Sequence, residues 1–250
     1  MVKIWEAVKG EQFITPMMAT IHRVVEDQEK AATLSLVKNI DEQGVLEDLL
    51  EQTKPKKPKG YDDLDYLLIT PFRYPPLKYG SRFGSSLEPS LFYGSLNVST
   101  ALAETAYYRF VFMAGMQEPY ADTILTRFSS YKVGIKTAHG IFLNKPPFEP
   151  YHHIITSPKY YADTQELGNS MRHAKLEAFQ FVSARDPKKG LNIALFSPKA
   201  FQSKKPISIE HWICNITNQD IGFISNDTQA RINFSRDIFL VDGQLPSPAC

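Results

Sequence analysis

The chain has 250 residues, 43% of them hydrophobic and 22% charged, which is enough to bury a sizeable core. Its 28 Lys and Arg residues nearly balance its 27 Asp and Glu residues, giving a formal net charge of +1. This balance argues against a protein that binds nucleic acid by broad charge attraction and leaves only a local basic patch for such contacts, so we expect no direct nucleic-acid binding.

The cysteine count and the lack of long apolar segments predict the cellular compartment of the protein. Its two cysteines, Cys214 and Cys250, are too few for a disulfide framework and fit a reducing compartment. The first ten residues, MVKIWEAVKG, lack the apolar run of a signal peptide, and no window approaches a membrane span. We therefore expect a cytoplasmic protein without a membrane segment, and secretion without a cleaved signal remains open.

The N-terminal region shows a helical pattern. Between residues 17 and 52 the apolar residues recur at helical spacing, beginning with Ile21, Val24 and Val25 on one face. The basic stretch KPKKPKG that follows cannot continue a helix, because its prolines lack an N–H. The pattern therefore predicts a helical segment followed by a linker.

We predict that residues 1–60 form a helical extension with a basic linker and that residues 61–250 form the main domain. Within the main domain, the patterns predict helices over 97–115 and 158–174 and a polar loop over 227–237. The predicted strands cover residues 64–70, 91–95, 123–135, 140–144, 177–185, 191–198, 207–217, 220–225 and 236–243. Helices interrupt the strands irregularly, which favours the α+β class over a doubly wound sheet.

Common catalytic and cofactor motifs are missing from the chain. There is no GxGxxG after a strand, no GxxxxGK[ST], no HExxH and no CxxC. The adjacent His152 and His153 have no Cys or carboxylate at ligand spacing, so they are more simply interpreted as loop histidines, and we expect no metal. Ser183 lacks the GxSxG elbow of a hydrolase nucleophile.

One group of four candidate residues lies between positions 73 and 104. Arg73 and Arg82 flank a proline-rich turn, and arginine forks match phosphate oxygens. Tyr93 ends a short predicted strand, and a tyrosine ring can stack on a flat heterocycle. Glu104 follows on a predicted helix, and a carboxylate can bind sugar hydroxyls and stabilise positive charge nearby. Together they describe a site for a dinucleotide whose glycosidic bond breaks through an oxocarbenium-like transition state.

Each of these residues also has an ordinary structural interpretation. A loop arginine is most often solvated or paired in a surface salt bridge, and a tyrosine is more often part of the core. Glu104 alone is an ordinary residue near the positive end of a helix dipole. The spacing of the residues leaves both interpretations open.

Two longer stretches carry a family resemblance. TPFRYPPLKYGSRFG…LFYGSLNVSTALAETAYYRF, followed by YYADTQELG…FQFVSARDPKKGLNIALFSP, resembles the RES domain, named for its Arg, Glu and Ser, from about Leu64 to Pro198. RES proteins resemble ADP-ribosyltransferases of the diphtheria-toxin type, which implies a mixed or antiparallel β core with flanking helices. Many are toxins of bacterial toxin–antitoxin pairs that degrade NAD⁺ by hydrolysis or phosphorolysis, and some transfer ADP-ribose to a protein. The resemblance therefore implies NAD⁺ as substrate and an antitoxin protein as partner.

The resemblance implies roles for five residues, all of which would contact NAD⁺, with Arg73, Glu104 and Ser183 as catalytic residues. Arg73 and Arg82 match the family arginines and would hold the pyrophosphate or the nicotinamide-side ribose. Tyr93 would stack against nicotinamide, and Glu104 would bind the ribose and stabilise the cation. Ser183 would orient the ribose, the leaving group or the acceptor. The two arginines lie closer together than in shorter RES toxins, so the division of their roles stays open.

Three functions follow from these observations. The leading one is an NAD⁺-consuming toxin that transfers ADP-ribose to water or phosphate. The second is ADP-ribosylation of a protein target, and the third is a binding or regulatory module with a degenerate site. The N-terminal extension could cover the site, mediate a homodimer or bind a partner.

Overall fold

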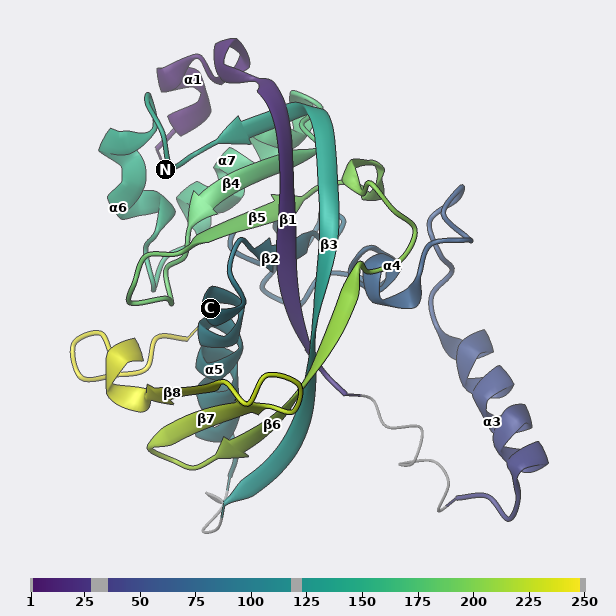
Figure 1. The fold of residues 1–250 in the computed structure, drawn as a ribbon. Helices are drawn as coiled ribbons and strands as arrows, with labels where there is room; N and C mark the ends of the chain where they lie inside the picture. The colour runs from purple at the N-terminus through teal and green to yellow at the C-terminus, as the bar shows by residue number, and fades with distance from the viewer. Residues whose placement is uncertain (1, 28–35, 118–122, 248–250) are drawn as a thin grey trace.

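The computed structural model describes residues 2–27, 36–117 and 123–247, arranged as Figure 1 shows. Its centre is one sheet of eight strands in the order β1-β2-β5-β4-β3-β6-β7-β8. The strands are β1 (Thr15–Glu26), β2 (Phe92–Ser95), β3 (Ile124–Phe142), β4 (Ala178–Val182), β5 (Leu191–Leu195), β6 (Ser208–Ile216), β7 (Asp220–Ser225) and β8 (Arg231–Ser235). Among these strands β3 and β4 pair in parallel and the other neighbours are antiparallel. The predicted α+β class is confirmed.

The long strand β3 joins a closed half of the sheet to an open half. From Met17 to Glu26, β1 pairs with β3 as well as meeting β2, so strands β1-β2-β5-β4-β3 close on themselves. The pairing between β1 and β2 is short, and in it His22 lies opposite Ser95. Beyond this closed half, β3 continues into an open half formed with β6, β7 and β8 (Figure 1).

Helices cover each half of the sheet. The described helices are α1 (Ile4–Val8), α3 (Ile40–Thr53), α4 (Tyr66–Arg73), α5 (Val98–Ala114), α6 (His152–Ile155), α7 (Ala162–His173) and the short 3₁₀ helices η1 (Gly10–Phe13), η2 (Glu149–Tyr151), η3 (Pro198–Ala200) and η4 (Arg236–Phe239). Of these, α3 lies apart from the sheet (Figure 1). Helix α5 packs Leu102 and Phe110 into the core of the open half. Helices α1 and α7 pack against the outward side chains of β4, such as Phe179, whereas α4 packs against the other face of the closed half.

Several sequence predictions are confirmed by the structure. The predicted strand at 91–95 and helix at 97–115 correspond to β2 and α5. The predicted hairpin of 177–185 and 191–198 corresponds to β4 and β5, which pair antiparallel. Strands β6 and β7 also lie where they were expected. Of these elements, β2, α5, β4 and β5 lie at the site described below.

The helical prediction for residues 17–52 is wrong in its first part. Thr15–Glu26 form β1, and helix α3 begins at Ile40. The apolar residues Ile21, Val24 and Val25 fit helical spacing, but β-branched side chains also favour a strand, and pairing with β3 decides between the two. Residues 1–60 thus contribute a strand to the main sheet as well as a helix; residues 28–35 lie outside the described part.

The strand predicted at 64–70 is also wrong, because this segment forms helix α4. Asp65 caps the helix by accepting a hydrogen bond from the N–H of Leu67 at 2.9 Å. Pro71 lies inside the helix and cannot donate to the carbonyl of Leu67, but the hydroxyl of Tyr131 does so at 2.8 Å. A short apolar run does not distinguish a strand from a buried helix. Here the cap at Asp65 favours the helix.

Three further boundaries differ from prediction. The strands predicted at 123–135 and 140–144 are joined in one strand, β3, which ends at Phe142, because the residues between them also pair with β1. The predicted last strand at 236–243 begins as helix η4, and the predicted loop before it contains β8. Ile232 and the buried Phe234 lie in the core of the open half and hold this strand in place. The helix predicted to start at Pro158 starts at Ala162.

Replacing Gly168 with alanine is expected to destabilise the fold by about 1–3 kcal/mol. A Cβ added at Gly168 in α7 would overlap the backbone carbonyl of Phe83, so the helix and the 81–84 loop would have to separate. Gly44→Ala in α3 is the matched control, because its added Cβ meets nothing within 4 Å and removes a helix-interior glycine. Urea denaturation should show a lower midpoint for Gly168→Ala and an unchanged or higher one for Gly44→Ala; equal midpoints would contradict this packing.

Candidate active site

The carboxylate of Glu104 lies where α5 crosses the ends of β4 and β5. Its Oε1 accepts two hydrogen bonds, one from the hydroxyl of Ser183 at 2.6 Å and one from Nδ2 of Asn192 at 2.7 Å. Both donors are neutral and both are buried, whereas Glu104 is partly exposed. The helix thus presents a carboxylate that is fixed on one oxygen by uncharged groups.

Ser183 is held by the turn that follows β4. Its side chain is fully buried, and its Oγ accepts hydrogen bonds from the backbone N–H groups of Arg185 (3.1 Å) and Asp186 (3.0 Å). The same Oγ therefore accepts from the backbone and donates to Glu104. This geometry makes Ser183 a support for the carboxylate rather than a free nucleophile.

The turn after Ser183 is fastened to the start of α5. Oδ2 of Asp186 accepts hydrogen bonds from the hydroxyl of Thr100 at 2.8 Å and from the N–H of Gly190 at 3.3 Å. A Cβ at Gly190 would overlap Thr100, so glycine permits the close approach of turn and helix. The contact fixes Ser183 relative to Glu104.

Two guanidinium groups meet at the hydroxyl of Tyr161. Nη2 of Arg82 donates to this hydroxyl at 3.3 Å and Nη2 of Arg185 at 3.0 Å. Arg82 also donates to the carbonyl of Ser157 at 2.6 Å, and Arg185 to that of Pro158 at 2.9 Å. Within the described residues neither guanidinium is paired with a carboxylate, so the cluster keeps its positive charge and suits an anion.

Both arginines and Glu104 act electrostatically on Tyr107 of α5. The guanidinium carbon of Arg185 lies 3.6 Å from the centre of the buried ring of Tyr107. Burial raises the pKa of Tyr107 to about 12; Arg185 and Arg82 oppose the rise, and Tyr161 and Glu104 add to it. Charges on both sides of the site therefore act on one tyrosine in α5.

Tyr93 supports the loop that carries Arg82. Its hydroxyl shares a hydrogen bond with Oγ of Ser81 at 2.9 Å and accepts one from the N–H of Phe83 at 3.3 Å. Its ring meets the edge of Phe181, and burial raises its pKa to about 12. These contacts hold the loop in place on either side of Arg82.

Arg73 lies at the end of α4 and binds a different part of the chain. Its Nη1 lies 2.6 Å from Oε1 of Glu51 in α3, and its Nε donates to the carbonyl of Pro55. Lys54 and Arg73 together lower the pKa of Glu51 to about 2. The structure thus connects Arg82, Glu104 and Ser183 in one region with Tyr93 beside them, and places Arg73 in contact with the N-terminal part.

Sequence reasoning missed Arg185, Tyr161 and Asn192. Arg185 lies two residues after the predicted Ser183 in the stretch SAR, and Asn192 is a polar residue in the otherwise apolar strand LNIALF. A polar residue within an apolar strand is a signal that could have indicated a buried polar contact. Arg23 was hidden by the helical interpretation of residues 17–52. It donates to the backbone carbonyl of Tyr93 at 2.7 Å, and its buried Nε has no hydrogen-bond partner among the described residues.

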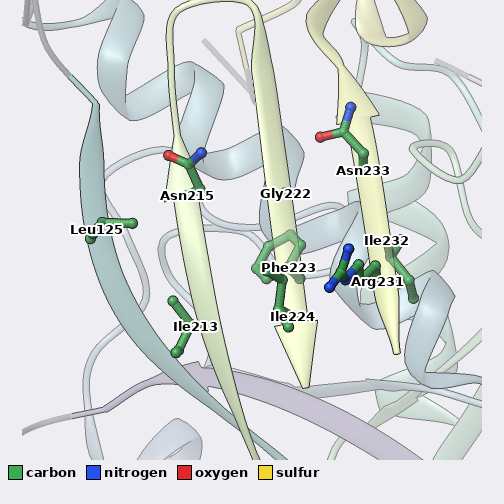
Figure 2. A pocket seen from close by; sticks show the side chains of 9 residues that line it. All are labelled: Leu125, Ile213, Asn215, Gly222, Phe223, Ile224, Arg231, Ile232 and Asn233. Carbon is green, nitrogen blue, oxygen red and sulfur yellow. The ribbon is translucent and has the colours of Figure 1, made fainter. Parts of the chain in front are cut away.

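A separate hollow of about 360 Å³ lies on the open half of the sheet. Figure 2 shows Leu125, Ile213 and Ile224 on the neighbouring strands β3, β6 and β7, and Gly222 on β7 contributes no side chain. Apart from Arg231, the lining is apolar or amide, and none of the five predicted site residues belongs to it. The lining of this hollow therefore includes few groups that could take part in catalysis.

The described ranges contain neither a membrane-spanning helix nor a cluster of metal-binding side chains. No helix there is long and apolar enough to cross a membrane. Across the same residues no group of three or more His, Cys, Asp or Glu side chains could hold a metal ion.

Comparisons with known proteins agree with this fold and these motifs. At the level of fold, the chain is similar to a chain of the crystal structure of the M. tuberculosis MbcT-MbcA toxin-antitoxin complex, with a TM-score of 0.50 and 7% sequence identity over 87% of this chain and 94% of that one. A model of the RES domain matches residues 57–217, more than half of the chain, and the protein therefore belongs to the RES domain family. No curated protein matches the chain.

Proposed function

We propose that the protein cleaves the bond between nicotinamide and ribose in NAD⁺ and transfers ADP-ribose to water or phosphate. The observation that carries the proposal is the Glu104 carboxylate, which two neutral donors hold on Oε1 and which Ser183 connects to the turn of Arg185. Through Tyr161 this turn meets Arg82, and among the described residues neither guanidinium has a carboxylate partner. Membership of the RES family and the fold shared with a protein from a toxin–antitoxin complex support it.

The chemistry requires a group that favours a cation at the ribose. As the C1′–N bond breaks, its electron pair goes to the pyridinium nitrogen, and nicotinamide leaves as a neutral molecule. The ribose becomes oxocarbenium-like, and the negative charge of Glu104 stabilises it while accepting a hydrogen bond from a ribose hydroxyl. Water or phosphate then forms the new bond to C1′, and water loses a proton to solvent.

The anion site in this proposal consists of Arg82 and Arg185. Both guanidiniums are held by carbonyl groups and by Tyr161, and both retain donors for the pyrophosphate of NAD⁺. Arg73 instead holds Glu51 and the carbonyl of Pro55, so we assign it a structural role. We propose this division for the two family arginines, whose roles the sequence leaves open.

Ser183 and Tyr93 act through other residues in this proposal. Ser183 is fully buried and donates to Glu104, so it orients the carboxylate instead of touching the acceptor. Tyr93 uses its hydroxyl to hold the Arg82 loop; stacking of its ring on nicotinamide stays a prediction.

The cellular context is that of a toxin with a protein antitoxin. The structural match comes from a complex described as toxin–antitoxin, and depletion of NAD⁺ in the cytoplasm would account for toxicity. We therefore propose that a cognate antitoxin binds this protein and that the protein acts in the cytoplasm.

The experiment that tests the function follows the products of NAD⁺. Purified protein is incubated with NAD⁺ labelled in the adenylate, with and without phosphate, and the products are separated by chromatography. We expect free nicotinamide with labelled ADP-ribose or its phosphorylated form, depending on the acceptor. Label retained on a protein would assign ADP-ribosyl transfer to a protein target instead, and unchanged NAD⁺ would overturn the proposal.

A further inference from the structure

The hydrogen bonds of Glu104 all end on one of its two oxygens. Ser183 and Asn192 both donate to Oε1, and among the described residues Oε2 receives no hydrogen bond. A carboxylate held in this way has one oxygen occupied by the protein and the other available to a ligand. Ser183 was expected from the sequence, whereas Asn192 was not.

The amide of Asn192 is fixed at both ends. Its Nδ2 donates to Glu104, and its Oδ1 accepts from the hydroxyl of Ser95 at 2.6 Å. Ser95 and Asn192 are direct register partners on β2 and β5, and their residues are only 2% and 5% exposed. Turning the amide over would place Oδ1 against Oε1 of Glu104, two acceptors in contact, so the amide keeps this orientation.

The neutrality of Asn192 suits the proposed chemistry. A lysine or arginine at this position would hold the carboxylate equally well but would offset its negative charge. An amide and a hydroxyl fix the position of the carboxylate and leave its charge available to a developing cation.

We propose that Asn192 is a positioning residue that, with Ser95 behind it, locks Oε1 of Glu104 so that Oε2 faces the ribose. The inference rests on the proposed function and adds a residue to it. Asn192 does not itself touch the reacting atoms, and it acts through the orientation of Glu104.

Asn192→Ala is expected to lower kcat for nicotinamide release by about 10- to 100-fold, because a small misplacement of a catalytic group has effects of this size. Binding of ADP-ribose, measured by calorimetry, should stay within about twofold, since the guanidinium cluster is untouched. Asn215→Ala, an exposed asparagine on β6 beside the hollow of Figure 2, is the matched control and should change neither quantity.

Asn192→Asp supplies a readout that a merely structural role would not change. The introduced carboxyl lies against Glu104, and like charges raise the pKa of one member of the pair. Below that pKa the shared proton restores a donor to Oε1, and above it two negative charges repel. We therefore expect kcat of this variant to fall as pH rises through a range in which the wild-type protein shows no such fall.

The outcomes separate this inference from the proposed function. Wild-type turnover with an unchanged kcat for Asn192→Ala, or with a wild-type pH profile for Asn192→Asp, would overturn the inference alone. Absence of wild-type turnover would overturn the function; crystal structures would then decide the inference, which fails if the Glu104 carboxylate keeps its position in Asn192→Ala. Circular dichroism melts of each variant establish that it is folded before these comparisons.

Discussion

Glu104→Gln is expected to lower kcat for nicotinamide release by about 10³-fold, with a much smaller change in NAD⁺ binding. The amide keeps the size of the side chain and can still accept at one oxygen from Ser183 and Asn192, so the variant should fold. It loses the negative charge, whose effect is greatest when the ribose carries positive charge. Chromatography of nicotinamide in samples quenched at successive times gives kcat, and calorimetry with ADP-ribose gives the binding constant.

The matched control for this change is Glu51→Gln. Glu51 is also a helical glutamate, but it lies in α3 and pairs with Arg73 and Lys54. Its replacement should leave kcat within about twofold, because exposed ion pairs contribute little and it lies outside the Glu104 network. Equal losses in both variants would indicate that the assay reports stability and would contradict a chemical role for Glu104.

Arg82→Ala and Arg185→Ala are each expected to weaken NAD⁺ binding by about 10- to 100-fold, the effect of losing hydrogen bonds to a charged group. The measurement is calorimetric titration of NAD⁺ into variants that also carry Glu104→Gln, so that the ligand is not consumed during the titration. Arg82→Lys should recover only part of the loss, because an ammonium cannot reproduce the bidentate fork of a guanidinium.

Arg73→Ala serves as the control for the arginine variants. Its guanidinium binds Glu51 and Pro55, so its removal should leave the NAD⁺ dissociation constant within about twofold and lower stability only slightly. A loss of NAD⁺ binding in Arg73→Ala that matched the loss in Arg82→Ala would contradict the assignment of the anion site.

The elements nearest the site were those that the sequence predicted best. Strand β2, helix α5 and the β4–β5 hairpin have local signals: a short apolar strand, a long helix ending at a glycine, and the turn DPKKG. Glu104 and Ser183 could be predicted to share a site because the resemblance to the RES domain places both of them there. Their hydrogen bond is a contact between residues 79 positions apart, which only the packed fold establishes.

The elements that were missed depend on partners distant in sequence. Residues 15–26 have a spacing that fits a helix, and they become a strand because β3 offers them a full antiparallel edge. Arg73 stands close to Arg82 in the chain, yet helix α4 directs it toward Glu51, whereas Arg185 reaches Arg82 through Tyr161. Proximity in sequence was therefore a poor guide to which guanidinium lies beside Arg82.

The most direct test of the central claim is the rate of nicotinamide release from saturating NAD⁺ by equal amounts of wild-type protein, Glu104→Gln and Arg73→Ala. We predict rapid release by the wild-type protein and by Arg73→Ala, and release slowed by about 10³-fold in Glu104→Gln. Release that is the same for Glu104→Gln as for the wild-type protein, or no release by the wild-type protein, would contradict the claim that Glu104 breaks the glycosidic bond of NAD⁺.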